Sequence, residues 1–150
     1  MSRPLSILSV IVVAAAALVA GVGSFDATRA AEFHFVSESL GDGRAIWLPR
    51  EVAIHKRTEL QDGLVFVLEN PTDRTHAFAA YGLFEEIMGA HGETTTKPLR
   101  VNVTPDDSVR VQVSTAQFEI GQDSPEESFP FFCPLHQGEA HVGGTIRVVP

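Results

Sequence analysis

Short apolar segments that alternate with polar residues recur along the chain, and this pattern most restricts the fold it can adopt. The segments Glu32–Val36, Leu99–Val103 and Val109–Val113 alternate with a period of two. This is the pattern of a strand with one face on a core. The other candidate strands are Ala45–Leu48, Glu51–His55, Leu64–Leu68, His76–Tyr81 and Thr145–Val149. The chain is therefore expected to be all-β.

Turn-forming residues separate these segments, and their spacing indicates how the strands pair. Pro105-Asp106-Asp107 stands between two alternating segments and predicts a hairpin there. Leu83–Ala90 is the one segment predicted to be helical, because Phe84, Ile87 and Met88 would share a helix face. Many short strands with little helix predict a single antiparallel β-sandwich domain.

The first thirty residues have the features of an export signal. Arg3 precedes the apolar run Leu5–Val22, and small residues follow around Ala30. We therefore expect residues 1–30 to form a signal peptide cleaved after Ala30, and residues 31–150 to form the domain. The run also reaches membrane-spanning length, so an uncleaved anchor is the alternative. In either case the domain is expected to be periplasmic or otherwise extracytoplasmic.

The charge of the chain restricts its partners. The net charge is −8, and the residues after Ala30 include nine basic and eighteen acidic side chains, a charge of −9. A polyanion would be repelled by this surface, so nucleic acid is not expected as a partner. An acidic surface is instead suited to a transient basic partner.

Soft and borderline metal ligands gather in one short segment near the C-terminus. Cys133, the single cysteine, is followed by His136 and His141 in a Cys-x2-His-x4-His spacing. Thiolate and imidazole are the ligands that copper and zinc prefer. His76 follows a predicted strand and turn, and it can reach the same end of a sandwich. The lone cysteine favours copper over a closed structural zinc site.

The segments around these ligands resemble the cupredoxin family. The resemblance is carried by His76-Ala77-Phe78, by Phe132-Cys133 with His136, and by a terminal Gly-Gly-Thr-Ile-Arg-Val-Val strand. It implies a Greek-key sandwich that binds one copper ion per chain. It also implies that His76, Cys133 and His136 are the three in-plane ligands.

The position of the weak axial ligand departs from the plastocyanin-like pattern. His141 stands where such proteins have methionine, and neither Met1 nor Met88 is a convincing substitute. The loop spacing resembles that of nitrosocyanin, a red copper protein. An axial imidazole should weaken the copper–sulfur bond, stabilise Cu(II) and lower the potential. We therefore expect a green or red copper centre if His141 binds.

These expectations lead to a one-electron carrier that exchanges electrons with a transient redox protein. A nitrosocyanin-like protein that binds or converts a small molecule such as nitric oxide is one alternative, and a periplasmic copper carrier is another. No Ser/His/Asp arrangement, phosphate loop or dinucleotide fingerprint is present in the sequence. An enzyme is therefore the less favoured interpretation. A membrane contact is expected only if the N-terminal segment is retained.

Overall fold

The computed structural model describes residues 29–41, 44–119, 125–135 and 143–150. Its elements, in chain order, are β1 (Ala31–Ser39), β2 (Ala45–Leu48), β3 (Glu51–His55), α1 (Lys56–Glu59), β4 (Leu64–Asn70), β5 (His76–Met88), β6 (Thr94–Val103), β7 (Asp107–Val113), β8 (Glu127–Phe132) and β9 (Gly144–Val149). The all-β prediction is confirmed. Residues 1–28 of the predicted signal segment 1–30 lie outside the described residues. No helix in the described part of the chain is long and apolar enough to span a membrane.

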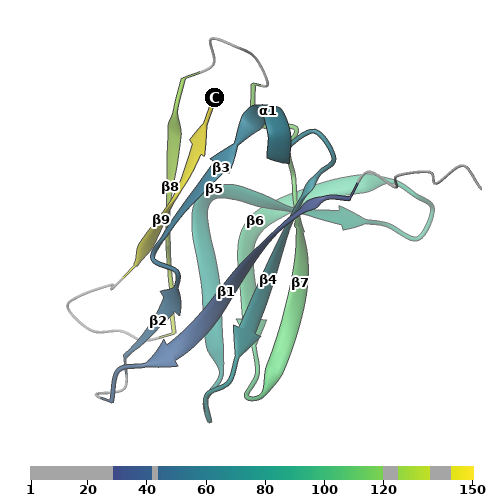
Figure 1. The fold of residues 1–150 in the computed structure, drawn as a ribbon. Helices are drawn as coiled ribbons and strands as arrows, with labels where there is room; N and C mark the ends of the chain where they lie inside the picture. Colours follow the sequence, from purple (N-terminus) through teal and green to yellow (C-terminus); the bar gives the residue numbers. More distant parts are fainter. Residues whose placement is uncertain (1–28, 42–43, 120–124, 136–142) are drawn as a thin grey trace, which may run out of the picture.

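The strands form one nine-stranded sheet in the order β2-β1-β4-β7-β5-β8-β9-β3, with β6 paired to β5 beside this path. A single residue pair, Glu85 with Val113, joins β7 to β5. Strands β2, β1, β4 and β7 therefore form one layer of a barrel-like sandwich, and β6, β5, β8, β9 and β3 form the other (Figure 1). Two neighbouring pairs are parallel, β1 with β4 and β3 with β9, while the others are antiparallel.

Aromatic rings join the two layers at the centre of the barrel. Phe35 of β1 lies 5.1 Å from Phe66 of β4 and 4.9 Å from Phe78 of β5, measured between ring centroids. Phe131 of β8 stacks on Phe78 at 5.2 Å. Edge-to-face and offset packing of this kind adds to the free energy of area burial, by about 0.5–1.5 kcal/mol per pair. The centre of the core is thus a cluster of aromatic rings between the two layers, and Phe78, near the start of β5, belongs to it.

The segment predicted to be helical is instead the second half of a long strand. Residues Phe84 to Met88 continue β5 and pair with residues 94–98 of β6. The prediction of a helix over Leu83–Ala90 is therefore wrong. The three consecutive threonines of β6, which favour strands, supply a pairing edge that a local helical periodicity does not reveal. Pairing between β5 and β6 outweighed the helical spacing of the apolar residues in this segment.

The hairpin predicted around Pro105–Asp107 is also not formed. β6 pairs with β5, whereas β7 pairs along its whole length with β4. The link between them crosses from one layer to the other, and Asp106 adopts a positive φ of 56° there. The Asp106 amide donates a hydrogen bond to the Asn70 carbonyl at 2.8 Å. This link therefore connects the layers instead of two neighbouring strands.

A fully buried lysine attaches α1 to the start of β8. Lys56 is 0% exposed, and its Nζ donates to Glu127 Oε1 at 2.7 Å and to the Pro125 carbonyl at 3.0 Å. A buried ammonium needs such partners because its desolvation is costly. This pair lies at the end of β3 and the beginning of β8, and it holds the two segments together.

Candidate metal centre

Two of the predicted ligands meet at one end of the barrel. His76 is the first residue of β5, and Cys133 directly follows the last residue of β8. β5 and β8 are antiparallel neighbours, with Ala79 opposite Phe132, so the start of one lies beside the end of the other (Figure 1). We call this end of the barrel the ligand pole.

Both side chains are buried, and their donor atoms face each other. His76 is 1% exposed and Cys133 is 5% exposed. The Cys133 Sγ lies 4.0 Å from His76 Nδ1. Bonds of about 2.3 Å to sulfur and 2.0 Å to nitrogen place two donors about 3.5–3.7 Å apart at tetrahedral to trigonal angles, close to the 4.0 Å observed. The separation therefore suits two ligands of one ion.

The other two predicted ligands, His136 and His141, lie outside the described residues. Among the residues that the structure describes, no group of three or more His, Cys, Asp or Glu side chains is placed to hold a metal. The remaining described histidines, His34, His55 and His91, are exposed. The set of four ligands thus stays a prediction, and the described residues include two of the four, His76 and Cys133.

Backbone and side-chain contacts hold the region next to His76 in place. The Ala77 amide donates a hydrogen bond to Cys133 Sγ at 3.4 Å. The Ala77 carbonyl accepts one from the indole Nε1 of Trp47 at 2.9 Å. Trp47 belongs to β2 in the opposite layer and is only 2% exposed. Both polar groups of Ala77 are therefore satisfied by side chains, where β5 has no neighbouring strand on that side.

Asn70 organises the turn that leads into His76. It is 1% exposed at the end of β4, and its amide Nδ2 donates to the carbonyls of Arg74 at 2.7 Å and Val103 at 2.9 Å. Its Oδ1 accepts bonds from the Thr72 amide at 3.1 Å and the Ser37 hydroxyl at 2.7 Å. This network fixes the loop between β4 and β5, and so the position from which His76 enters the barrel.

Sequence reasoning missed both Trp47 and Asn70 as contributors to this end of the barrel. For Asn70, the signal that could have indicated a buried network is a polar residue two positions after the wholly apolar run Leu64–Leu68. For Trp47 the signal is weaker, because a lone indole in a short apolar strand also fits simple core packing. Its link to Ala77 depends on the pairing of layers.

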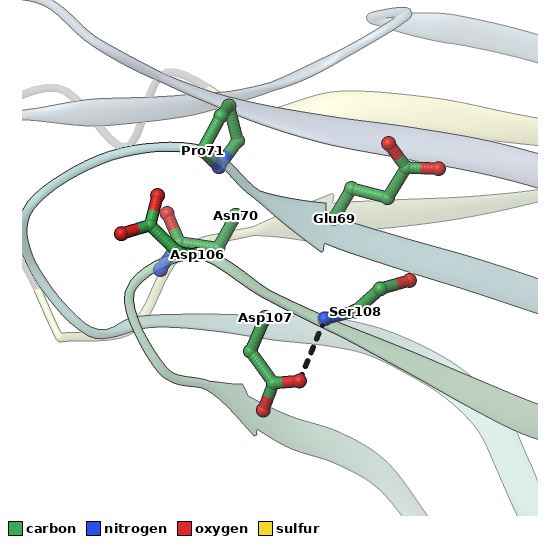
Figure 2. Close-up of a pocket in the computed structure, with 6 residues that line it drawn as sticks. All are labelled: Glu69, Asn70, Pro71, Asp106, Asp107 and Ser108. Carbon is green, nitrogen blue, oxygen red and sulfur yellow. Dashed lines mark hydrogen bonds between the residues drawn. The ribbon is translucent and has the colours of Figure 1, made fainter.

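An acidic recess lies beside the Asn70 turn. Its volume is about 350 Å³, and it is lined by Glu69, Asn70, Pro71, Asp106, Asp107 and Ser108. Figure 2 shows Asp106, Asp107 and Ser108 on the link and strand opposite the end of β4, with the Ser108 amide bonded to the Asp107 carboxylate at 2.8 Å. The carboxylates give this part of the surface a negative potential.

Comparison with solved structures shows the fold. The multicopper oxidase McoA from the hyperthermophile Aquifex aeolicus aligns over 81% of this chain and 30% of its own, with a TM-score of 0.53 and 12% identity. A laccase from Pediococcus acidilactici Pa5930 aligns over 81% and 27%, with a TM-score of 0.51 and 16% identity. The chain thus spans less than a third of the length of either protein.

These similarities and the strand arrangement show that the chain has a cupredoxin-like fold. No family model matches the chain, and no curated protein matches it. The Greek-key sandwich expected from the resemblance is confirmed as a fold class. The nitrosocyanin-like loop, residues 133–141, lies largely outside the described residues and remains a prediction.

Proposed function

We propose that the chain binds one copper ion at the ligand pole and acts as a one-electron carrier. The observation that carries the proposal is the buried pair of His76 and Cys133, with donor atoms 4.0 Å apart. A thiolate and an imidazole form a donor set suited to copper. His136 would supply the second imidazole, and His141 would occupy the axial position.

The surroundings of the pair favour electron transfer over catalysis. The Trp47 and Asn70 hydrogen bonds fix the start of β5, and the Ala77 amide bonds to the Cys133 sulfur, so a change of copper valence would need little rearrangement. Four protein ligands would also leave no open position for a substrate. Bound copper would supply the redox change, and the chain would supply a rigid, largely dehydrated site for it.

We further propose that the domain works outside the cytoplasm with a basic redox partner. The support is the N-terminal apolar run with its small-residue cleavage site, and the net charge of −9 after Ala30. Accessible copper and oxidising conditions outside the cytoplasm also suit a protein whose single thiol is held by a metal.

Optical and EPR spectra of the copper-loaded, exported full chain test the copper site. We expect one copper per chain, a green or red spectrum, and reversible reduction by ascorbate. Cys133→Ser should abolish the intense sulfur-to-copper absorption, and His76→Ala should weaken copper binding. His91→Ala is the matched control, because His91 is exposed on the β5–β6 turn, and it should leave the spectrum unchanged.

His141→Met tests the axial ligand within the same experiment. Replacing an imidazole by a weak thioether should shift the spectrum towards blue and raise the reduction potential. A wild-type protein that is already deep blue would contradict ligation by His141. A spectrum that changes on addition of nitric oxide or azide would instead favour the nitrosocyanin-like alternative, since it requires an open coordination position.

A further inference from the structure

A break in the β5–β6 ladder creates a cavity next to the ligand pole. Ala79 pairs with Arg100 and Phe84 pairs with Pro98, so residues 80–83 of β5 stand opposite Leu99 alone. Gly82 has a φ of +84°, which glycine adopts without the strain that a side chain would add. The extra residues move β5 away from β6 and leave space between the strands.

The cavity has the size and lining of a small-molecule site. Its volume is about 370 Å³, within the range of about 300–1,000 Å³ of ligand sites. Leu83 and Leu99, both buried, contribute to its lining. Tyr81 and Phe132 also line it, with ring centroids 5.0 Å apart, and Tyr81 is 66% exposed. The lining thus presents apolar and aromatic surface, part of it open to solvent.

One cation lies at this cavity. Arg100 contributes to the lining and is exposed, and its side chain forms no hydrogen bond or ion pair with any residue that the structure describes. Lys97, on the same strand, is instead paired with Glu85 at 3.0 Å. A guanidinium beside apolar surface is suited to a carboxylate, which it can bind through two parallel hydrogen bonds.

We propose that this cavity binds a small, flat ring system that carries a carboxylate. The ring would lie against Tyr81, Phe132 and the leucines, and the carboxylate would face Arg100. Phe132 and Pro134, which flank Cys133 in sequence, both line the cavity. A bound molecule would therefore contact the residues on both sides of the proposed copper ligand. The inference rests on the cavity and does not require copper.

Titration of the full chain with 2-naphthoate tests the proposal, by calorimetry and by amide chemical shifts of the metal-free protein. We expect saturable binding of one molecule, with shifts confined to residues 79–84, 98–100 and 132–134. Because a hydrogen-bonded charge pair is lost, Arg100→Gln should weaken binding by about tenfold, and Arg100→Lys should weaken it less. The neutral isostere 2-naphthamide should bind wild type about tenfold more weakly than the acid.

Lys97→Gln is the matched control, because it removes a neighbouring cation that does not line the cavity, and it should leave the affinity unchanged. Circular dichroism of each variant checks that the fold is retained. Equal affinity for the acid and the amide, an effect of Lys97→Gln as large as that of Arg100→Gln, or shifts outside the cavity would overturn the proposal. So would the absence of saturable binding at millimolar 2-naphthoate.

Discussion

At the scale of single residues, Ala77 is held more firmly than its small side chain suggests. Its amide is bonded to the sulfur of Cys133 and its carbonyl to the indole of Trp47. One bond reaches the residue after β8 and the other reaches β2 in the opposite layer. The position of His76, its neighbour, is therefore coupled to the packing between the layers.

Replacing Trp47 by phenylalanine tests this coupling. The variant keeps an aromatic ring but leaves the buried Ala77 carbonyl without its donor, so we expect the free energy of unfolding to fall by about 1–3 kcal/mol. Urea titration measures the change. Tyr81→Phe removes a polar atom from an exposed ring and should alter stability by less than about 0.5 kcal/mol. Similar losses in both variants would contradict a specific role for the Trp47 bond.

The sequence allowed some of these residues to be predicted and not others. Spacing and side-chain chemistry singled out His76 and Cys133, because few residue types bind soft metals. Trp47 and Asn70 could not be predicted in the same way, because their contribution includes hydrogen bonds to residues far along the chain, Ala77 for Trp47 and Ser37 and Val103 for Asn70. Such bonds depend on how strands from different layers are placed, which local patterns do not specify.

At the scale of elements, β5 is a long strand whose pairing with β6 changes register between Ala79 and Phe84. Its first half borders the ligand pole, and its second half forms a long hairpin with β6 that extends beyond the body of the barrel (Figure 1). The apolar residues Phe84, Ile87 and Met88 match a helical spacing, which produced the wrong prediction there. Gly82 lies between the two halves, and it adopts a positive φ at the place where the pairing register changes.

Two glycine substitutions separate backbone strain from steric contact at this bulge. Gly82 and Gly92 have nearly equal φ values, +84° and +82°. A Cβ at Gly82 would lie 3.0 Å from the ring of Phe129, whereas a Cβ at Gly92 meets nothing within 4 Å. Gly92→Ala should therefore cost about 1–2 kcal/mol through strain alone. Gly82→Ala should cost a further ~1 kcal/mol or more, because the ring must move.

Thermal and urea unfolding of the two variants measures this difference. The loss of stability of each variant is measured relative to the wild type. The difference between the two losses removes the strain of a positive φ, which both variants share. Equal destabilisation by the two substitutions would show that Phe129 yields without cost and that contact with its ring does not constrain the bulge.

A carboxylate on β1 links this strand to β7 in the first layer and makes the stability of the layer depend on pH. Glu32 accepts hydrogen bonds from Arg110 of β7 at 3.0 Å and from Arg29 at 2.8 Å. The bonds from Arg110, and then those from Arg29, lower the pKa of Glu32 from the ordinary 4.5 to about 2. A lowered pKa in the folded state stabilises the fold above the unfolded value, and this contribution is lost as the pH falls.

Glu32→Gln should therefore reduce stability at neutral pH and become equivalent to wild type as the pH falls from 4.5 towards 2. Urea titrations at several pH values measure the difference. Glu38→Gln is the control, because Glu38 is exposed on the same strand and its side chain forms no hydrogen bond or ion pair with a described residue. A difference between wild type and Glu32→Gln that persists unchanged to pH 2 would contradict the assignment.

At the scale of the whole molecule, the acidic surface should govern the rate at which a redox partner is met. Attraction between the protein and a basic cytochrome raises the association rate, and salt screens it. We expect the electron-transfer rate with such a cytochrome to fall by about tenfold on going from low to physiological ionic strength. Stopped-flow mixing measures it. Reduction by a neutral small molecule should be insensitive to salt, and equal salt dependence for both would contradict electrostatic steering.

The fold class could be predicted from the sequence more completely than the pairing and the connections of the strands. Alternation and turn residues sufficed for an all-β fold, since they report which face of each strand is buried. The parallel pairs β1–β4 and β3–β9 and the crossing between β6 and β7 could not be predicted. Strands that pair across long stretches of sequence leave no local pattern. A fully antiparallel sandwich and one with two parallel strand pairs would therefore show the same pattern in the sequence.

The parallel pairing of β1 with β4 also fixes where the chain enters the barrel. β4 runs towards the ligand pole, because Asn70 at its end leads to His76, and β1 runs beside it in the same direction from Ala31. Whatever precedes Ala31 therefore joins the barrel at the end remote from His76 and Cys133. If the segment before Ala31 is retained as an anchor, it would attach the domain by this end and leave the end with His76 and Cys133 facing away from the membrane.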